Sequence, residues 1–293
     1  MKSSSGWTDL VELIKTINLD FNNIDSVLNV DRVLWAFAVN QVISNLDCYN
    51  TYYVHNYYLY KSKDGLFQMI PWDLDNSFSG AIMGWDYWNQ SNIYEYDAYF
   101  PGPSLGGSTQ PWDERPLLFK LLDNPLYRDI YTAHIRTIVN ESLDTSVIRN
   151  NINNLQNLSY NSASLDVNKV FSMNEFHDNV ENAIWSNSWG FGGIISTINQ
   201  RKQYLLSHPE ISEIPPFISN VSVNNNIITA NVFNSNFVEL MFTESQYNSR
   251  FTSIYMNDDG VNGDVTSNDG IYSANISSNL NSIFKFYIRA HND

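Results

Sequence analysis

The chain has 293 residues, too long for one average domain and suited to two, and 43% of them are hydrophobic, enough for real cores. Its formal charge is −15, from 16 basic and 31 acidic residues. This balance argues against a nucleic-acid partner, because binding that backbone needs clustered Lys and Arg. No run approaches the roughly 18 apolar residues of a membrane span, so no span is predicted.

Residues 7–208 predict a mostly helical region. A first helix should begin at Thr8-Asp9, and a second should begin near Asn29, run into Asp47 and break at Asn50-Thr51. Later helices are predicted from Arg115-Pro116 and over about 125–140, 144–156, 171–187 and 194–207. Residues 80–115 lack a period and predict a long ordered loop. Arg115 and Arg201 fall on helices, where we expect ion pairs rather than phosphate binding.

Between the second and third helices the sequence predicts a β-hairpin. The runs YYLYK and LFQMI are rich in aromatic and apolar residues, and they flank the turn signal Lys63-Asp64-Gly65. Asp47 and Asn56 precede the hairpin, and Asp73 and Asp75 follow it. A hairpin brings its two ends together, so these oxygen-bearing side chains predict a Mg²⁺ site shared with a substrate phosphate. If the second strand continues, Asp73 and Asp75 project to one face.

The order of these parts is also that of a protein kinase. A kinase has a catalytic Asp that accepts the hydroxyl proton, then a metal-binding Asn, and later a metal-binding Asp. In this order Asp47 would be the base, Asn56 the first metal ligand and Asp73 the second. Asp47 and Asn56 are nine residues apart, whereas the ordinary kinase motif separates them by roughly five.

The segment HNYYLYKSKDGLFQMIPWDLDNSFSG resembles the signature of the spore coat protein H (CotH) kinase family. The resemblance extends through NVDRVLWAFAVNQVISNLD before it and PLLFKLLDNPLYRDIY after it, and covers roughly residues 7–208. It implies an atypical, secreted or surface-associated bacterial protein kinase with a rearranged kinase fold. It also implies Asp47 as catalytic base and Asp73 as metal ligand, with ATP, Mg²⁺ or Mn²⁺, and a protein substrate.

A kinase also needs a phosphate-covering loop and a Lys paired with a Glu on an amino-terminal lobe, and nothing before Trp7 can supply them. The start also lacks the apolar core of a signal peptide. We therefore expect residues 7–211 to be the carboxy-terminal part of such a kinase. We expect this chain alone to show weak or no autophosphorylation, which upstream sequence would restore.

Other interpretations remain open. Asp73 and Asp75 could cap a turn, Asp47 could be a structural residue at a helix end, and His55 is interpreted as a packing or hydrogen-bonding residue. The chain could be a non-catalytic, pseudokinase-like surface protein that binds a glycan or a protein. The sugar-stacking candidates in the long loop are Trp85, Tyr87, Trp88, Tyr94, Tyr96 and Tyr99. A glycosidase is disfavoured because Asp73 and Asp75 are too close along the chain to flank a sugar bond.

Residues 212–293 change character after Ile214-Pro215-Pro216. Short alternating runs between Asn, Asp and Gly turns predict an antiparallel, immunoglobulin-like β-sandwich, so the whole chain is expected to be α+β. The sandwich would serve attachment or bind a surface or cell-wall partner. Its Asp258–Asp269 loop is a candidate Ca²⁺ site that departs from the EF-hand pattern, and an Asx-rich turn explains it equally well.

Overall fold

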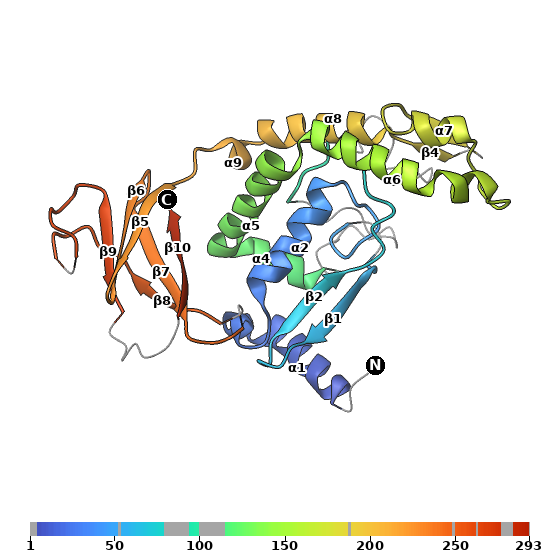
Figure 1. Cartoon of the computed structure of the whole chain (residues 1–293). Helices are drawn as coiled ribbons and strands as arrows, with labels where there is room; N and C mark the ends of the chain where they lie inside the picture. Colours follow the sequence, from blue (N-terminus) through green and yellow to red (C-terminus); the bar gives the residue numbers. More distant parts are fainter. Residues whose placement is uncertain are drawn as a thin grey trace. The chain divides into compact units, whose positions relative to one another are not determined.

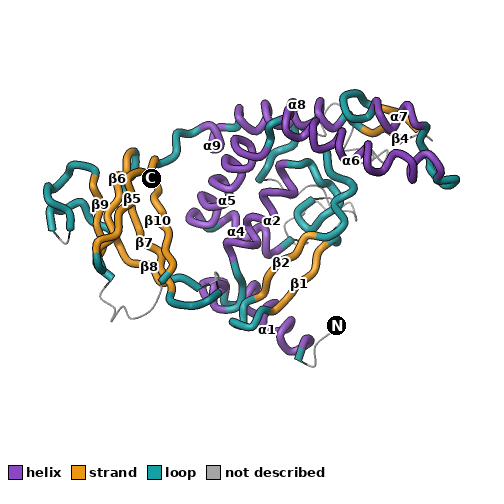
Figure 2. Tube along the Cα trace, viewed as in Figure 1, coloured by secondary structure: helices purple, strands orange, loops and turns teal. Residues whose placement is uncertain are grey.

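The computed structural model describes residues 5–51, 54–78, 94–99, 115–186, 189–247, 250–261, 263–276 and 284–292. The chain divides into two compact units, Met1–Ser212 and Glu213–Asp293. Helices dominate the first unit and antiparallel strands form the second, so the fold is α+β, as predicted (Figures 1 and 2).

Three helices of the first unit lie before residue 43, and its other described helices begin at residue 116 or later. They are α1 (Gly6–Leu19), η1 (Phe21–Ser26), α2 (Val30–Val42), α4 (Pro116–Asp123), α5 (Pro125–Thr137), η2 (Ile138–Ser142), α6 (Thr145–Leu165), α7 (Met173–Asp178), α8 (Ile194–Ser207) and α9 (Pro209–Ser212). Of the helices that the structure describes, none combines the length and apolar character that crossing a membrane requires.

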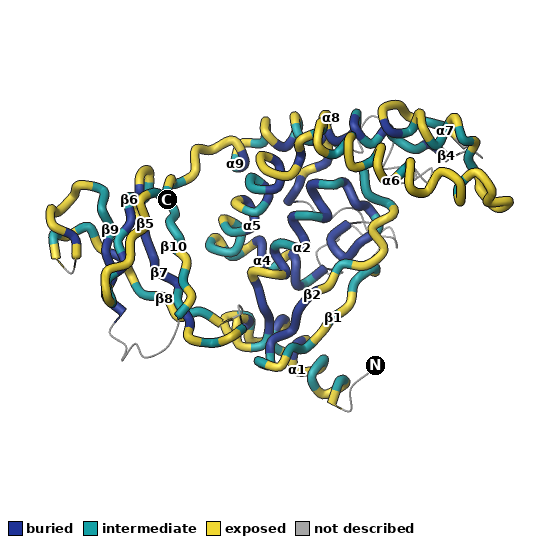
Figure 3. Tube along the Cα trace, in the orientation of Figure 1, coloured by how far each residue is buried: buried dark blue, intermediate teal, exposed yellow. Residues whose placement is uncertain are grey.

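Helix α2 is the central element of the first unit, where it packs against α5, α8, η2 and the β-hairpin. It begins as predicted, because the Asn29 side chain accepts a hydrogen bond from the Arg32 amide at 3.2 Å and caps the helix. Along α2, Val33, Leu34 and Phe37 are fully buried. Burial of such side chains stabilises a fold by about 1.5–3 kcal/mol each. Figure 3 shows that α2 is mostly buried, whereas α6 is mostly exposed.

The end of α2 differs from the prediction. The helix ends at Val42 rather than running into Asp47. Ser44 adopts the left-handed conformation with φ 52°, and the backbone N–H of Asn45 donates to the backbone carbonyl of Asn40 at 2.9 Å. This bond closes a wider turn than an α-helix has, so the chain leaves the helix before it reaches Asp47.

The predicted hairpin is confirmed as β1 (Tyr57–Lys61) paired antiparallel with β2 (Phe67–Pro71). Gly65 at the turn has φ 86°, a conformation that favours glycine. On its other side β2 is tied to the segment before α2, because Phe67 exchanges backbone hydrogen bonds with Val27 and Asn29 at 2.8 and 2.9 Å. The hairpin is therefore fixed against the start of α2.

Three other predicted helices have different bounds in the structure. Helix α6 continues to Leu165, beyond the predicted end near residue 156. Helix α1 begins at Gly6, and the predicted helix over 171–187 is the short helix α7 followed by a hairpin of β3 (Ile184–Ser186) and β4 (Trp189–Phe191). Gly193 follows this hairpin, where a Cβ atom would lie 2.3 Å from the Glu181 carbonyl oxygen, so only glycine fits. Of the predicted loop over 80–115, only 94–99 and the final residue lie within the described part of the chain.

In its described residues the second unit has six strands in two three-stranded antiparallel sheets, with orders β5-β6-β9 and β10-β7-β8. The strands are β5 (Phe217–Asn224), β6 (Ile227–Phe233), β7 (Phe237–Thr243), β8 (Thr252–Tyr255), β9 (Ile271–Asn275) and β10 (Lys285–His291). Ile228 and Ala230 of one sheet and Val238 and Leu240 of the other belong to a single buried cluster. The two sheets therefore share one hydrophobic core.

Candidate active site

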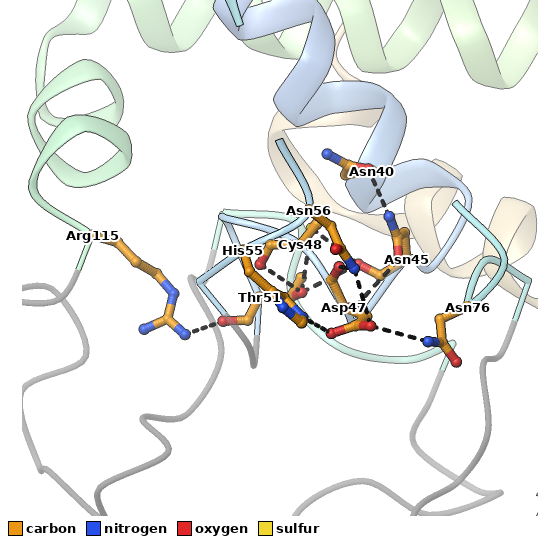
Figure 4. Close-up of polar contacts among 9 residues, drawn as sticks. All are labelled: Asn40, Asn45, Asp47, Cys48, Thr51, His55, Asn56, Asn76 and Arg115. Carbon is orange, nitrogen blue, oxygen red and sulfur yellow. Dashed lines mark hydrogen bonds and ion pairs between the residues drawn. The ribbon is translucent and has the colours of Figure 1, made fainter. Parts of the chain in front are cut away.

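The loop between α2 and β1 is held by buried polar side chains (Figure 4). The side-chain amide of Asn45 donates to Asn40 Oδ1 at 3.0 Å, and the side-chain amide of Asn50 donates to the main-chain carbonyl of Phe37 at 3.2 Å. The Thr51 hydroxyl donates to the Asn45 carbonyl at 3.2 Å. Buried polar groups are expected to be paired in this way. The network fixes the backbone on both sides of Asp47.

The side chain of Asp47 lies at the centre of three donors (Figure 4). His55 contacts Oδ1 through its Nε2 atom. The Asn56 amide donates to Oδ2 at 3.1 Å and to the Asp47 main-chain carbonyl at 2.9 Å. The Asn76 amide donates to Oδ2 at 3.1 Å. The carboxylate therefore joins the segment before the hairpin to the segment after it.

The open end of the hairpin has an unusual backbone. Asn56 has φ 57° and Asp73 has φ 55°, in the left-handed region that Asn and Asp adopt more readily than other non-glycine residues. The Trp72 amide donates to the Asn56 carbonyl at 2.9 Å, which extends the hairpin pairing by one step. Asp73 therefore follows directly after the residue that pairs with Asn56.

Asp73 and Asp75 are exposed, and among the residues that the structure describes neither carboxylate accepts a hydrogen bond. Strand β2 ends at Pro71, so it does not continue through them and the expected alternation of faces does not apply. The segment turns back instead, because the Phe78 amide donates to the Ile43 carbonyl at 2.6 Å. Asp75 lies in this turn, and Asn76 reaches Asp47 from it.

Sequence reasoning did not identify Asn76 as part of this site. Asn76 lies three residues after Asp73 in WDLDN, and this spacing by itself does not indicate a contact with Asp47. His55 was expected to form packing or hydrogen-bonding contacts, and its partner is Asp47 itself. Both contacts depend on how the loop and the segment after β2 fold together, which the sequence pattern does not specify.

Arg201 in α8 is buried, and its expected carboxylate partner is replaced by backbone carbonyls. The guanidinium donates to the carbonyls of Gln41 at 3.2 Å and Tyr94 at 3.0 Å, and also to that of Tyr96. It stacks 4.0 Å from the centre of the Tyr96 ring. Burial lowers the pKa of Arg201 below its ordinary value. Arg115, just before α4, is also buried and donates to the Thr51 carbonyl.

Cys48, next to Asp47, provides a test of how closed this loop is. The thiol is buried, and burial raises its pKa to about 11. A pKa above neutral pH keeps it a thiol, and only the thiolate reacts rapidly with disulfide reagents.

We predict that Ellman's reagent labels Cys48 negligibly at pH 8 in the folded protein and labels one thiol per chain in guanidinium chloride. Rapid labelling of the folded protein would show that the loop opens. The same measurement with N-acetylcysteine checks the activity of the reagent.

In the second unit, Asp258, Asp264 and Asp269 each offer a carboxylate oxygen, and these atoms lie within 4.8 Å of one another. Each carboxylate also accepts backbone N–H groups. Asp258 Oδ2 accepts from Gly270 at 2.8 Å, Asp264 Oδ1 from Thr266 at 3.1 Å, and Asp269 Oδ1 from Ile271 at 3.0 Å. The bonds of Asp264 and Asp269 reach the residue two positions on, as in Asx turns, whereas that of Asp258 ties the two ends of the loop together. All three leave lone pairs on the carboxylates.

The comparisons with known proteins concern the first unit. The family model described as CotH kinase protein matches residues 1–205, which include Asp47, the hairpin and the segment after it. The curated proteins include no match to this chain. The family match covers more than half of the sequence and agrees with the signature in and around the hairpin. The chain belongs to the CotH kinase family.

Proposed function

We propose that this protein is an atypical protein kinase that transfers the γ-phosphoryl group of ATP to a protein hydroxyl. The observation that carries the proposal is the contact between Asp47 and Asn56, the residues in the order of a kinase base and metal ligand. Family membership supports it independently. A kinase-like arrangement of the first unit and a secreted or surface location are parts of the same proposal.

In this mechanism Asp47 acts as the base. The acceptor hydroxyl gives its proton to the Asp47 carboxylate, its oxygen bonds to the γ-phosphorus, and the bond from that phosphorus to the bridging oxygen breaks to leave ADP. The fixed loop around Asp47 holds the carboxylate in place before the substrate arrives, which reduces the entropic cost of reaching the transition state.

The donor set after the hairpin is suited to Mg²⁺ or Mn²⁺. Both ions prefer carboxylate and carbonyl oxygens, and the Asp73 and Asp75 carboxylates accept no hydrogen bond in the described part of the chain. Asn56 uses its amide N–H groups on Asp47, which leaves its Oδ1 atom for a ligand. Asn56, Asp73 and Asp75 would hold the ion, which would neutralise charge on the ATP phosphates.

We predict that radiolabelled ATP transfers phosphate to the complete gene product only when Mg²⁺ or Mn²⁺ is present. Asp73→Ala should abolish incorporation, because the carboxylate would no longer hold the ion. The matched control is Asp64→Ala, at the turn of the same hairpin, which should retain activity. Incorporation that survives Asp73→Ala, or that needs no divalent ion, would contradict the proposed site.

We also propose that residues 213–293 form an immunoglobulin-like sandwich that serves attachment or partner binding. The shared core of the two sheets supports this proposal. Its candidate ligand is Ca²⁺ at the carboxylates of Asp258, Asp264 and Asp269, whose mutual repulsion a cation would reduce.

We predict that millimolar Ca²⁺ raises the melting temperature of the transition assigned to this unit, since a ligand that binds only the folded state stabilises it. Mg²⁺ at the same concentration should raise it less, and Asp264→Asn should remove the Ca²⁺ effect. An unchanged melting temperature in differential scanning calorimetry would leave the three residues as turn caps.

A further inference from the structure

The hydrogen bonds of Asp47 distinguish its two carboxylate oxygens. An ionised carboxylate only accepts hydrogen bonds, with about two lone pairs on each oxygen. Oδ2 accepts from Asn56 and from Asn76, both at 3.1 Å, which uses both of its lone pairs. Oδ1 accepts from His55, and in the described part of the chain it has no second donor. One lone pair on Oδ1 is therefore available, and it lies beside the His55 ring.

The position of His55 is suited to contact with a substrate. Its side chain is 53% exposed, whereas that of Asp47 is 18% exposed. His55 directly precedes Asn56, whose left-handed backbone turns the chain into β1. A hydroxyl that approaches Oδ1 from solvent would therefore meet the imidazole of His55 at the same time.

We propose that His55 is a positioning residue for phosphoryl transfer. It donates its Nε2–H to Asp47 Oδ1 and so directs the remaining lone pair of that oxygen toward the acceptor hydroxyl. The proton of the hydroxyl passes to Oδ1, while His55 keeps its own proton and holds the carboxylate. The two Asn amides fix Oδ2, and His55 sets the rotation of the carboxylate about its last torsion. This inference rests on the proposed kinase function.

The kinetic test compares His55→Ala and His55→Gln in autophosphorylation by the complete gene product with Mg-ATP. His55→Ala should lower kcat by about 10- to 100-fold, the cost of misplacing a reacting group by about 1 Å. The KM for ATP should stay unchanged. In His55→Gln the side-chain amide can donate from nearly the same place, so most of the rate should return. The matched control is His134→Gln, because His134 also pairs with a carboxylate, that of Asp31, at 2.9 Å.

Three kinetic outcomes would overturn the proposal. A wild-type kcat in His55→Ala would show that Asn56 and Asn76 suffice to hold Asp47. A rate in His55→Gln as low as that of Asp47→Ala would make His55 the proton acceptor itself. A loss of rate in His134→Gln equal to that in His55→Ala would mark the effect as one of general stability.

A second measurement does not depend on kinase activity. The ring ¹⁵N resonances of His55 report its bonded Nε2–H, and Asp47→Ala should shift them while the resonances of His134 stay in place. If neither the wild type nor any variant incorporates phosphate but the His55 resonances shift, the proposed kinase function fails, while the hydrogen-bonded pair of His55 and Asp47 is confirmed. If the resonances do not respond to Asp47→Ala, the pair is absent in solution and the positioning role fails.

Discussion

Asp47→Ala should lower the rate of phosphoryl transfer by about 10²- to 10⁴-fold, the usual contribution of a positioned general base. Asp47 is the carboxylate that three donors hold at the open end of the hairpin, so its loss removes both the proton acceptor and the group that Asn56 contacts. The affinity for Mg-ATP should change little, because Asp73 and Asp75 are untouched and Asn56 keeps its 2.9 Å hydrogen bond to the main-chain carbonyl of residue 47.

Separate measurements of the transfer rate and of the affinity for Mg-ATP distinguish a carboxylate that acts as base, Asp47, from one that holds the metal, Asp73. Asp73→Ala should weaken the binding of Mg-ATP, measured by the fluorescence of a labelled nucleotide, whereas Asp47→Ala should not. The control is Asp178→Ala, an exposed carboxylate at the end of α7, which should have wild-type values for both. If Asp47→Ala instead weakens nucleotide binding as much as Asp73→Ala, Asp47 would be a metal ligand and the base would lie elsewhere.

The sequence predicted the hairpin and the contact between Asn56 and Asp47, because the signals are local. A glycine turn between two apolar runs fixes the pairing of β1 with β2, and this pairing places Trp72 opposite Asn56. The contact between Asn56 and Asp47 follows from the short loop before the hairpin. These are the features on which the proposed site depends.

The features that the sequence did not predict depend on contacts between distant segments. The early end of α2 results from the bonds between Asn40 and Asn45, which a helical pattern of apolar residues does not reveal. The role of Asn76 requires the segment after β2 to fold back onto Ile43. The pair of short strands after α7 was interpreted as helix because three residues are too few for a strand period to appear.

Arg201→Met should lower the melting temperature of the first unit by about 6–12 °C. Arg201 is 1% exposed and donates to three backbone carbonyls. The carbonyl of Gln41 keeps a second donor, the Tyr96 hydroxyl at 3.1 Å, but those of Tyr94 and Tyr96 would lose the guanidinium. Each buried acceptor left without a partner costs about 1–3 kcal/mol.

Part of this loss is offset, because the substitution removes a buried charge that burial disfavours, as the lowered pKa of Arg201 shows. A net destabilisation of about 3 kcal/mol corresponds to the predicted shift for a unit of this size. Arg201→Lys keeps the charge but not the planar set of donors, so its melting temperature should lie between those of the wild type and Arg201→Met.

The matched control is Arg149→Met, which removes an arginine whose ion pair with Glu181 lies at the surface, with side chains 41% and 46% exposed. Exposed pairs contribute little, so this variant should melt close to wild type. Calorimetry of the three variants decides between two views of α8. A large shift for Arg201→Met alone would mean that Arg201 fixes α8 to the end of α2, directly before the loop that holds Asp47. Equal, small shifts would mean that apolar packing of α8 is sufficient, and that the position of this loop does not depend on Arg201.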